Sequence, residues 1–265
     1  MKQYLKLLHK VLNEGIPSED RTGTGTRRIF GEQLRFNLQE GFPLLTTKKM
    51  YSRSSIHELL WMLRGESNIN YLKENNVHIW DAWADEDGYV GPLYGVQWRK
   101  WLYDCDTIDQ LQQVIDEIKM EPYSRRMVIS AWNVGQLEFM NLPPCHIMFQ
   151  FHADPVNKEL SMSMYQRSAD IFLGLPFDIC LYALLLSMVA QITGYKPKDL
   201  IISFGDVHLY NDHAEQAHMQ LTREPLKLPT LWLNPEISDI DDFKFEDIEI
   251  RDYKYHPAIK AKVSV

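Results

Sequence analysis

The chain has 265 residues, of which 45% are hydrophobic and 24% charged, so it is long enough for one sizeable core and lacks the composition of a disordered protein. The net charge of −8 argues against bulk attraction to nucleic-acid phosphates and favours a small anionic ligand in a local basic pocket. Three cysteines cannot all pair, and no CxxC spacing indicates a metal or redox centre. Because we find neither an apolar signal core nor a run of about 18 apolar residues, we expect a soluble cytoplasmic protein.

The apolar pattern predicts helices that alternate with extended segments. Leu5, Leu8, Val11 and Leu12 have helical spacing, and Gly15 behind them is a candidate C-cap. The other predicted elements, in chain order, are a polar turn over 18–26, a helix over 55–63, a helix from a Thr107 cap to Pro122, strands over 127–132, 147–151 and 160–165, an almost wholly apolar helix over 179–192, and strands over 200–204 and 248–253.

The predicted helix over 179–192 is shorter than a membrane span, and a helix that is apolar all round is usually buried in the centre of a domain. The sequence has no repeats, low-complexity tracts or long linkers. We therefore predict a single α+β domain over residues 1–265, with a mixed β-sheet packed by helices.

Cys145 follows Pro143 and Pro144, which fix the backbone where it enters a predicted strand. A cysteine at so rigid a point is a candidate nucleophile, and the alternative is a buried structural thiol. His146 is not a dyad partner by adjacency, because neighbouring side chains of a strand point to opposite faces. A thiolate needs nearby cations that lower the pKa of the thiol. The candidate cations are Arg21, Arg125, Arg126 and Arg167.

Two polar clusters, at residues 124–126 and 165–170, carry arginine in otherwise apolar surroundings. Arginine forks suit phosphate, and the Ser168 hydroxyl adds a donor, so a phosphomonoester site is one interpretation. A surface ion pair is the commoner use of each cluster taken alone. The loop 22–25 lacks the spacing of the known phosphate-binding glycine motifs and is a weak signal.

Glu58 lies among apolar neighbours in the predicted helix over 55–63. It is either a general acid or base with a raised pKa or a carboxylate that faces solvent beside the apolar stripe. His208, His213 and His218 recur every five residues, which does not align them on one helix face, so we expect no metal site. The tryptophans either line a pocket for a flat heterocycle or pack in the core. They are Trp61, Trp80, Trp83, Trp98 and Trp101.

A series of motifs runs in order along the whole chain: 20–26 (DRTGTGT), 79–81 (IWD), 91–95 (GPLYG), 124–126 (SRR), 143–146 (PPCH), 165–170 (YQRSAD), 205–210 (GDVHLY) and 257–260 (PAIK). Together these motifs resemble the thymidylate synthase family. The resemblance implies a homodimer with shared active sites and no metal. It also implies that the enzyme transfers a one-carbon unit from the co-substrate 5,10-methylenetetrahydrofolate to C5 of a 2′-deoxypyrimidine monophosphate.

The resemblance also implies roles for individual residues. Cys145 matches the nucleophile that adds to C6 of the pyrimidine, and Glu58 matches the carboxylate that organises water and proton transfer. The matches to nucleotide contacts are Arg21, Arg167 and Ser168 at the phosphate, Arg125 and Arg126 reaching in from the other subunit, His208 and Tyr210 at the deoxyribose hydroxyl, and Gln166, Tyr94 and His146 in the nucleotide pocket. The matches to folate contacts are Lys48, Trp80, Trp83, Asp170, Gly174, Phe177 and the C-terminal Val265, whose tail folds over the bound pair.

Asp178 departs from the family, which carries asparagine at this place. Uracil offers an N3–H donor and an O4 acceptor, which one amide pairs. Cytosine reverses both, and a neutral carboxylic acid matches it by donating to N3 and accepting from N4. Burial favours this neutral form, and the alternative is a carboxylate bound to N3-protonated cytosine. We therefore predict dCMP over dUMP, with Asp178 in a binding and a catalytic role. Cys180 and Leu181 stand where the family usually has alanine and serine, which fits a reworked pocket wall.

Two products are open. Hydride from the tetrahydrofolate gives a methyl group, and water attack on an exocyclic methylene gives hydroxymethyl. Trp80, Trp83 and the tail favour a dry site, yet the family members known for dCMP are chiefly hydroxymethylases that supply DNA modification, so we favour hydroxymethyl. The alternatives are an ordinary thymidylate synthase and an inactive nucleotide- or RNA-binding homologue. We expect no contact with DNA or a membrane.

Overall fold

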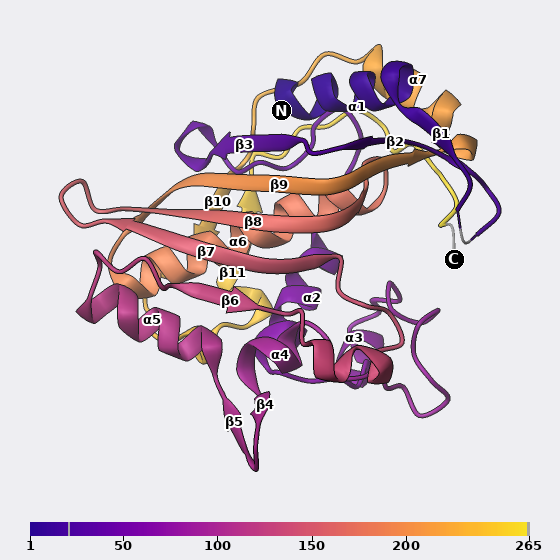
Figure 1. Cartoon of the computed structure of the whole chain (residues 1–265). Helices are drawn as coiled ribbons and strands as arrows, with labels where there is room; N and C mark the ends of the chain where they lie inside the picture. The colour runs from indigo at the N-terminus through magenta and orange to yellow at the C-terminus, as the bar shows by residue number, and fades with distance from the viewer. Residues whose placement is uncertain (21, 264–265) are drawn as a thin grey trace.

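The computed structural model covers the whole chain and describes residues 1–20 and 22–263, in which helices and strands alternate (Figure 1). The helices are α1 (Lys2–Glu14), α2 (Ser52–Leu63), α3 (Asn70–Glu74), α4 (Gly95–Arg99), α5 (Gln110–Met120), α6 (Gly174–Thr193) and α7 (Ala214–Leu221). The strands are β1 (Ile16–Ser18), β2 (Thr26–Phe30), β3 (Gln33–Asn37), β4 (Trp101–Tyr103), β5 (Asp106–Ile108), β6 (Val128–Ser130), β7 (His146–Asp154), β8 (Glu159–Asp170), β9 (Lys196–Tyr210), β10 (Thr230–Leu233) and β11 (Ile248–Arg251).

Within the described residues, seven strands form one sheet in the order β1-β2-β9-β8-β7-β6, and β3 also pairs with β9. Strands β8 and β9 are parallel, and α6 makes the crossover that a parallel pair requires. The other pairs of this sheet are antiparallel. Figure 1 shows β7, β8 and β9 side by side, with α6 behind them. The predicted α+β domain with a mixed sheet packed by helices is confirmed.

Helix α6 packs against β8 and β9 and also against α2. It is buried without a break from Ile179 to Ala190. It begins before the predicted residue 179 because Pro176 lies in the first turn, where a helix needs no backbone N–H donor. By length and composition α6 could cross a membrane, but 78% of its apolar window is buried inside the fold. It is therefore the core helix that the sequence predicts.

Several predicted boundaries differ from the structure, and the physical reason is clear for two more of them. Thr107 does not cap a helix, because it pairs with Leu102 in the β4–β5 hairpin, and the Asp109 side chain caps α5 by accepting from Gln112 N–H at 2.9 Å. Strand β9 runs well beyond the predicted 200–204, through Gly205. A glycine is needed there because a Cβ would lie 2.8 Å from the Arg167 carbonyl oxygen.

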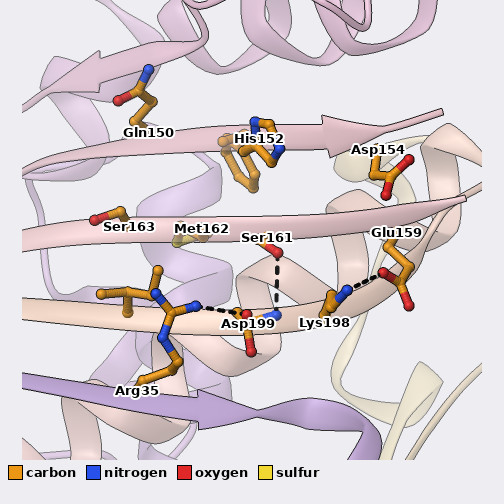
Figure 2. A pocket seen from close by; sticks show the side chains of 12 residues that line it. Arg35, Gln150, His152, Asp154, Glu159, Ser161, Met162, Ser163, Lys198 and Asp199 are labelled. Atoms are coloured by element: carbon orange, nitrogen blue, oxygen red, sulfur yellow. Dashed lines mark hydrogen bonds and ion pairs between the residues drawn. The ribbon is translucent and has the colours of Figure 1, made fainter. Parts of the chain in front are cut away.

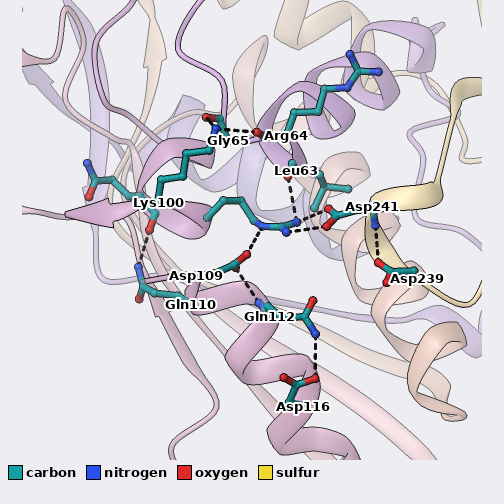
Figure 3. A network of polar contacts seen from close by, with 12 residues as sticks. Leu63, Arg64, Gly65, Lys100, Asp109, Gln110, Gln112, Asp116, Asp239 and Asp241 are labelled. Atoms are coloured by element: carbon teal, nitrogen blue, oxygen red, sulfur yellow. Dashed lines mark hydrogen bonds and ion pairs between the residues drawn. The ribbon is translucent and has the colours of Figure 1, made fainter. Parts of the chain in front are cut away.

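Arg99, at the end of α4, joins four segments of the chain. Figure 3 labels its partners Leu63, Asp109 and Asp241. Its guanidinium donates to Asp109 at 2.9 Å, to the Leu63 carbonyl at 3.1 Å, and to both carboxylate oxygens of Asp241 at 2.6 and 2.9 Å. These contacts hold the end of α4 against the end of α2. Because α2 carries Glu58, Arg99 helps to fix where that carboxyl lies.

Candidate active site

Four side chains from β7, β8 and α6 meet at the centre of the site. His146 and Gln166 are directly paired across β7 and β8, and Asp178 and Tyr182 lie one turn apart on α6. Gln166 Nε2 donates to Asp178 Oδ2 at 2.7 Å, and the Tyr182 hydroxyl lies 2.6 Å from His146 Nδ1. His146 Nε2 faces Asp178 Oδ1 at 3.9 Å. Strand pairing and helix phase thus bring together three predicted residues and a fourth, Tyr182, that was not predicted.

Burial sets the charge of this group. It raises the pKa of Asp178 to about 7, against the opposing hydrogen bond from Gln166. It lowers the pKa of His146 to about 3. At neutral pH His146 is therefore uncharged, and Asp178 exchanges between the acid and the carboxylate. The 3.9 Å contact between them is consequently not an ion pair.

The backbone of Cys145 is held on both sides. Its N–H donates to the Tyr94 hydroxyl at 2.9 Å, and its carbonyl accepts from the Arg167 N–H at 2.8 Å. The Arg167 guanidinium donates to the carbonyls of Pro143 and Pro144, each at 2.8 Å. Arg167 therefore reinforces the rigid entry into β7 that the two prolines predict.

The pKa of the Cys145 thiol is raised, because burial outweighs the attraction of Arg167. Arg167 does act to lower this pKa, as predicted, but burial is the larger effect and the net shift is upward. Arg125 and Arg126 are exposed, and the register of β6 with β7 places them at the end of this strand pair opposite to Cys145. Arg21 lies outside the described residues.

Tyr94 borders the site and has an unusual backbone. Its ring stacks on His146 with centroids 4.1 Å apart. Its φ of 40° is a left-handed conformation that is rare for a bulky side chain. Gly95 follows because a Cβ there would lie 2.1 Å from the Met62 carbonyl oxygen. Such strain is found preferentially at functional sites.

Glu58 is the third carboxyl or thiol of the site whose pKa is raised. Trp80 Nε1 donates to Glu58 Oε1 at 2.8 Å. Burial raises the pKa of Glu58 to about 8, the Trp80 hydrogen bond opposes this, and Asp178 adds to it. Of the two interpretations of Glu58, the geometry supports the carboxyl with a raised pKa. Trp80 also packs edge-on against Trp83 and Tyr94, at 5.7 and 5.8 Å, so these rings form one aromatic wall.

His208 and Ser168 lie on β9 and β8, the parallel pair of the sheet. Ser168 is the register partner of Asp206. Asp206 Oδ1 lies 2.9 Å from His208 Nδ1, and the Tyr210 ring meets His208 edge-on at 5.3 Å. Asp206 therefore holds the imidazole of His208 in one orientation. The structure brings these residues to the β8–β9 pair as the resemblance implies, and adds Asp206 as their support.

Four of the predicted folate contacts lie at or near the start of α6: Lys48, Asp170, Gly174 and Phe177. Asp170 Oδ1 accepts from the backbone N–H of Phe172 at 2.9 Å. Lys48 is buried and donates to the Phe172 carbonyl, with its ammonium 3.8 Å from the centre of that ring. Burial lowers the pKa of Lys48 to about 8, although Asp170 opposes this. The remaining predicted folate contacts are Gly174 and Phe177 in the first turn of α6, Trp80 and Trp83 in the aromatic wall, and Val265, which lies outside the described residues.

Sequence reasoning gave no role to Tyr182 or Asp206. Tyr182 follows Asp178 by four residues in the chain, and this spacing places both on one face of a helix. Asp206 lies beyond the predicted strand 200–204, so the sequence did not show that it shares a strand face with His208 two residues later.

Among residues 1–20 and 22–263, no three His, Cys, Asp or Glu side chains are grouped so that they could hold a metal ion.

A family model described as thymidylate synthase matches residues 2–265, nearly the whole chain. Members of this family use methylenetetrahydrofolate as co-substrate and are usually dimers that bind nucleotide and folate. The match identifies the protein as a folate-dependent methyltransferase that acts on C5 of a pyrimidine nucleotide. The chain belongs to the thymidylate synthase family.

Proposed function

We propose that this enzyme transfers the one-carbon unit to C5 of dCMP in preference to dUMP. The observation that carries the proposal is the buried carboxyl of Asp178, whose pKa burial raises to about 7. A neutral carboxyl donates to one partner and accepts from another. Cytosine N3 accepts and its N4 donates, so the neutral acid matches both atoms. Uracil presents the opposite pattern, so its N3–H donor and O4 acceptor both lack a matching group on the neutral acid.

The contacts of Gln166 support this assignment. Its Nε2 donates to Asp178 Oδ2, which leaves Oδ1 as the oxygen that carries the proton. Its own Oε1 is buried and has no partner within the described residues. A buried acceptor of this kind is costly unless a ligand supplies a donor. Gln166 is therefore placed to orient the carboxyl and to contact the base itself.

The chemistry follows from the placement of the side chains. As the sulfur of Cys145 bonds to C6 and releases its proton to solvent, ring electrons move toward N3, and the proton of Asp178 passes to N3. C5 then attacks the folate methylene. After C5 loses its proton and the folate leaves, an exocyclic methylene remains on the pyrimidine. Glu58, whose pKa burial raises to about 8, is the carboxyl placed to move protons in these later steps.

We infer that water adds to this methylene and gives up a proton, that the C6–S bond to Cys145 then breaks and the N3 proton returns to Asp178, and that the product is 5-hydroxymethyl-dCMP. A carboxyl with a raised pKa is a stronger base toward water once it has lost its proton. Burial raises the pKa of Glu58 in this way. The specific observation that favours hydride transfer and a methyl product is the aromatic wall of Trp80, Trp83 and Tyr94, which excludes water. The product is therefore hydroxymethyl if Glu58 activates a water molecule, and methyl if the aromatic wall keeps water out.

The proposed active form is a cytoplasmic homodimer with shared sites. Arg125 and Arg126 are exposed and lie far along β6–β7 from Cys145 of the same chain, so they suit the phosphate in a partner's site. We assign the contact with the second subunit to the outward face of the sheet. It contains a hollow of about 360 Å³ lined by β3, β7, β8 and β9, with the ion pairs Arg35–Asp199 and Lys198–Glu159 in it (Figure 2).

Incubation of the enzyme with methylenetetrahydrofolate and either dCMP or dUMP tests the proposal. The product is weighed by mass spectrometry, and dihydrofolate is followed by absorbance. We expect hydroxymethyl-dCMP without dihydrofolate. Dihydrofolate formed in step with product would exclude hydroxymethylation, because only the methyl route oxidises the folate. Preferred turnover of dUMP would indicate an ordinary thymidylate synthase, and no turnover of either nucleotide would indicate an inactive binding homologue.

A further inference from the structure

We propose that Tyr182 is a positioning residue that fixes neutral His146 in the tautomer with hydrogen on Nε2, so that the imidazole presents a donor to Asp178. The tautomer is a property of the protein alone. Its consequence for catalysis rests on the proposed role of Asp178 in reading cytosine.

The first step concerns the Tyr182 hydroxyl. Tyr182 is fully buried, and within the described part of the chain its hydroxyl has His146 Nδ1 as its hydrogen-bond partner, at 2.6 Å. A phenol of raised pKa in this core keeps its proton. If the phenol accepted from Nδ1–H, its own hydrogen would be buried without an acceptor, which is unfavourable. The phenol therefore donates, Nδ1 accepts, and the imidazole hydrogen lies on Nε2.

The second step concerns the direction of Nε2–H. It faces Asp178 Oδ1 at 3.9 Å, while Gln166 already donates to Oδ2 at 2.7 Å. The Gln166 hydrogen bond strengthens as negative charge develops on the carboxyl, because a hydrogen bond to an ionised acceptor is roughly twice as strong as a neutral one. At 3.9 Å the Nε2–H of His146 is beyond hydrogen-bond distance, and it stabilises the same charge through its dipole. The arrangement therefore favours release of the Asp178 proton to the base, although burial raises the share of the neutral acid beforehand.

Other titratable groups also act on Asp178 and must stay constant in a test. They are Cys145 on β7, Asp170 at the end of β8, Glu58 on α2 and Tyr94 before α4. Tyr182→Phe replaces none of these residues, although the Tyr182 hydroxyl is one of the groups that raise the pKa of Tyr94. It keeps a ring in contact with Trp98 and Phe149, at centroid distances of 6.2 and 5.5 Å, and removes only the hydroxyl. The variant thus separates the hydrogen bond from the packing.

Tyr71 provides a matched control. Its hydroxyl lies 3.0 Å from His57 Nδ1, so it is a second tyrosine–histidine pair in the same protein. His57 stacks on Phe245, outside the proposed site. Tyr71→Phe therefore removes the same type of hydrogen bond without touching His146.

The test is ¹⁵N NMR of protein labelled on histidine, without nucleotide, with the His146 signals assigned from a His146→Asn variant. We expect Nε2–H for His146 in the wild type and in Tyr71→Phe, and loss of this single tautomer in Tyr182→Phe. Hydrogen on Nδ1 in the wild type, or an unchanged tautomer in Tyr182→Phe, would overturn the proposal whatever the substrate is.

Kinetics with dCMP supply the second measurement. In Tyr182→Phe the pKa of Asp178 rises because a donor to the carboxylate is no longer fixed, so the pH profile of kcat moves up by about half a unit to one unit. We expect kcat to fall about tenfold while KM changes little. An unshifted profile, or equal changes in Tyr71→Phe, would contradict the positioning role. A wild type that prefers dUMP would contradict the proposed function and leave the tautomer result standing.

Discussion

Asp178 and Tyr182 lie one turn apart on α6, and they contact two residues that are directly paired on the strands: Asp178 accepts from Gln166, and Tyr182 contacts His146. One helix face therefore meets one cross-strand pair. The carboxyl that we propose reads the base, and the hydroxyl that contacts the neighbouring imidazole, are thus fixed by the same packing of α6 on the sheet. A rotation of α6 would disturb both contacts together.

Replacement of Cys145 by serine should lower kcat by at least about 10⁴-fold, because a serine hydroxyl is not a thiolate and adds poorly to C6. Turnover and the mass of any covalent protein–nucleotide adduct are the measurements. Cys105→Ser is the control, since Cys105 is exposed on the turn between β4 and β5. An adduct that persists in Cys145→Ser would show that another residue is the nucleophile.

Much of the fold was predictable because its signals are local. The spacing of Leu5, Leu8 and Val11 predicts α1, and the run from Ile179 predicts a core helix. The N-terminal end of α6 was missed because Pro176 normally argues against a helix, although the first turn tolerates it. Strands β2 and β3 were not predicted because they pair with β9, which is distant in the sequence.

The site was predictable as far as residue types and motifs define it. Cys145 lies in the motif 143–146, Glu58 was noted as a carboxyl among apolar neighbours, and Asp178 was noted as a departure from the family. The effect of Arg167 on the pKa of Cys145 was predicted, but the larger opposing effect of burial was not, because burial is a tertiary property. Tyr182 was missed because its role depends on the phase of α6 relative to His146 on β7.

Asp206→Asn should raise the KM for the nucleotide about tenfold and leave kcat nearly unchanged, because it weakens the contact that orients His208 and not a group at the reacting atoms. Steady-state kinetics check this. Asp104→Asn is the control, since Asp104 is an exposed residue in the turn between β4 and β5. A loss confined to kcat would place Asp206 in the chemistry instead.

Mixing two inactive variants tests the shared site. Cys145→Ala removes a group used by its own chain, and Arg126→Ala removes one that we assign to the partner's site. A mixed dimer then contains one intact site, so random exchange should restore about a quarter of wild-type activity. Cys145→Ala mixed with Glu58→Gln should restore none, because both groups belong to one chain's site. Failure of the first mixture to gain activity would count against Arg126 acting across the dimer.

Stability should fall as the pH rises from about 6.5 to 8. The folded-state pKa of Asp178 is raised from 3.8 to about 7 and that of Glu58 from 4.5 to about 8, so the folded protein binds more protons than the unfolded chain in this window. His146, lowered from 6.5 to about 3, acts in the opposite direction and only below that window. Urea unfolding of Asp178→Asn should show a shallower fall than the wild type. Equal slopes would mean that the carboxyl of Asp178 is already ionised.

The ratio of kcat/KM for dCMP to that for dUMP, measured side by side in the wild type and in Asp178→Asn, tests the central claim most directly. Asp104→Asn is the control, because Asp104 is an exposed turn residue whose left-handed φ of 53° suits asparagine. We predict a ratio well above one in the wild type and in Asp104→Asn, and a fall of about 10²-fold or more in Asp178→Asn. A wild-type ratio below one, or a ratio that Asp178→Asn leaves unchanged, would contradict the assignment of Asp178 as the residue that selects cytosine.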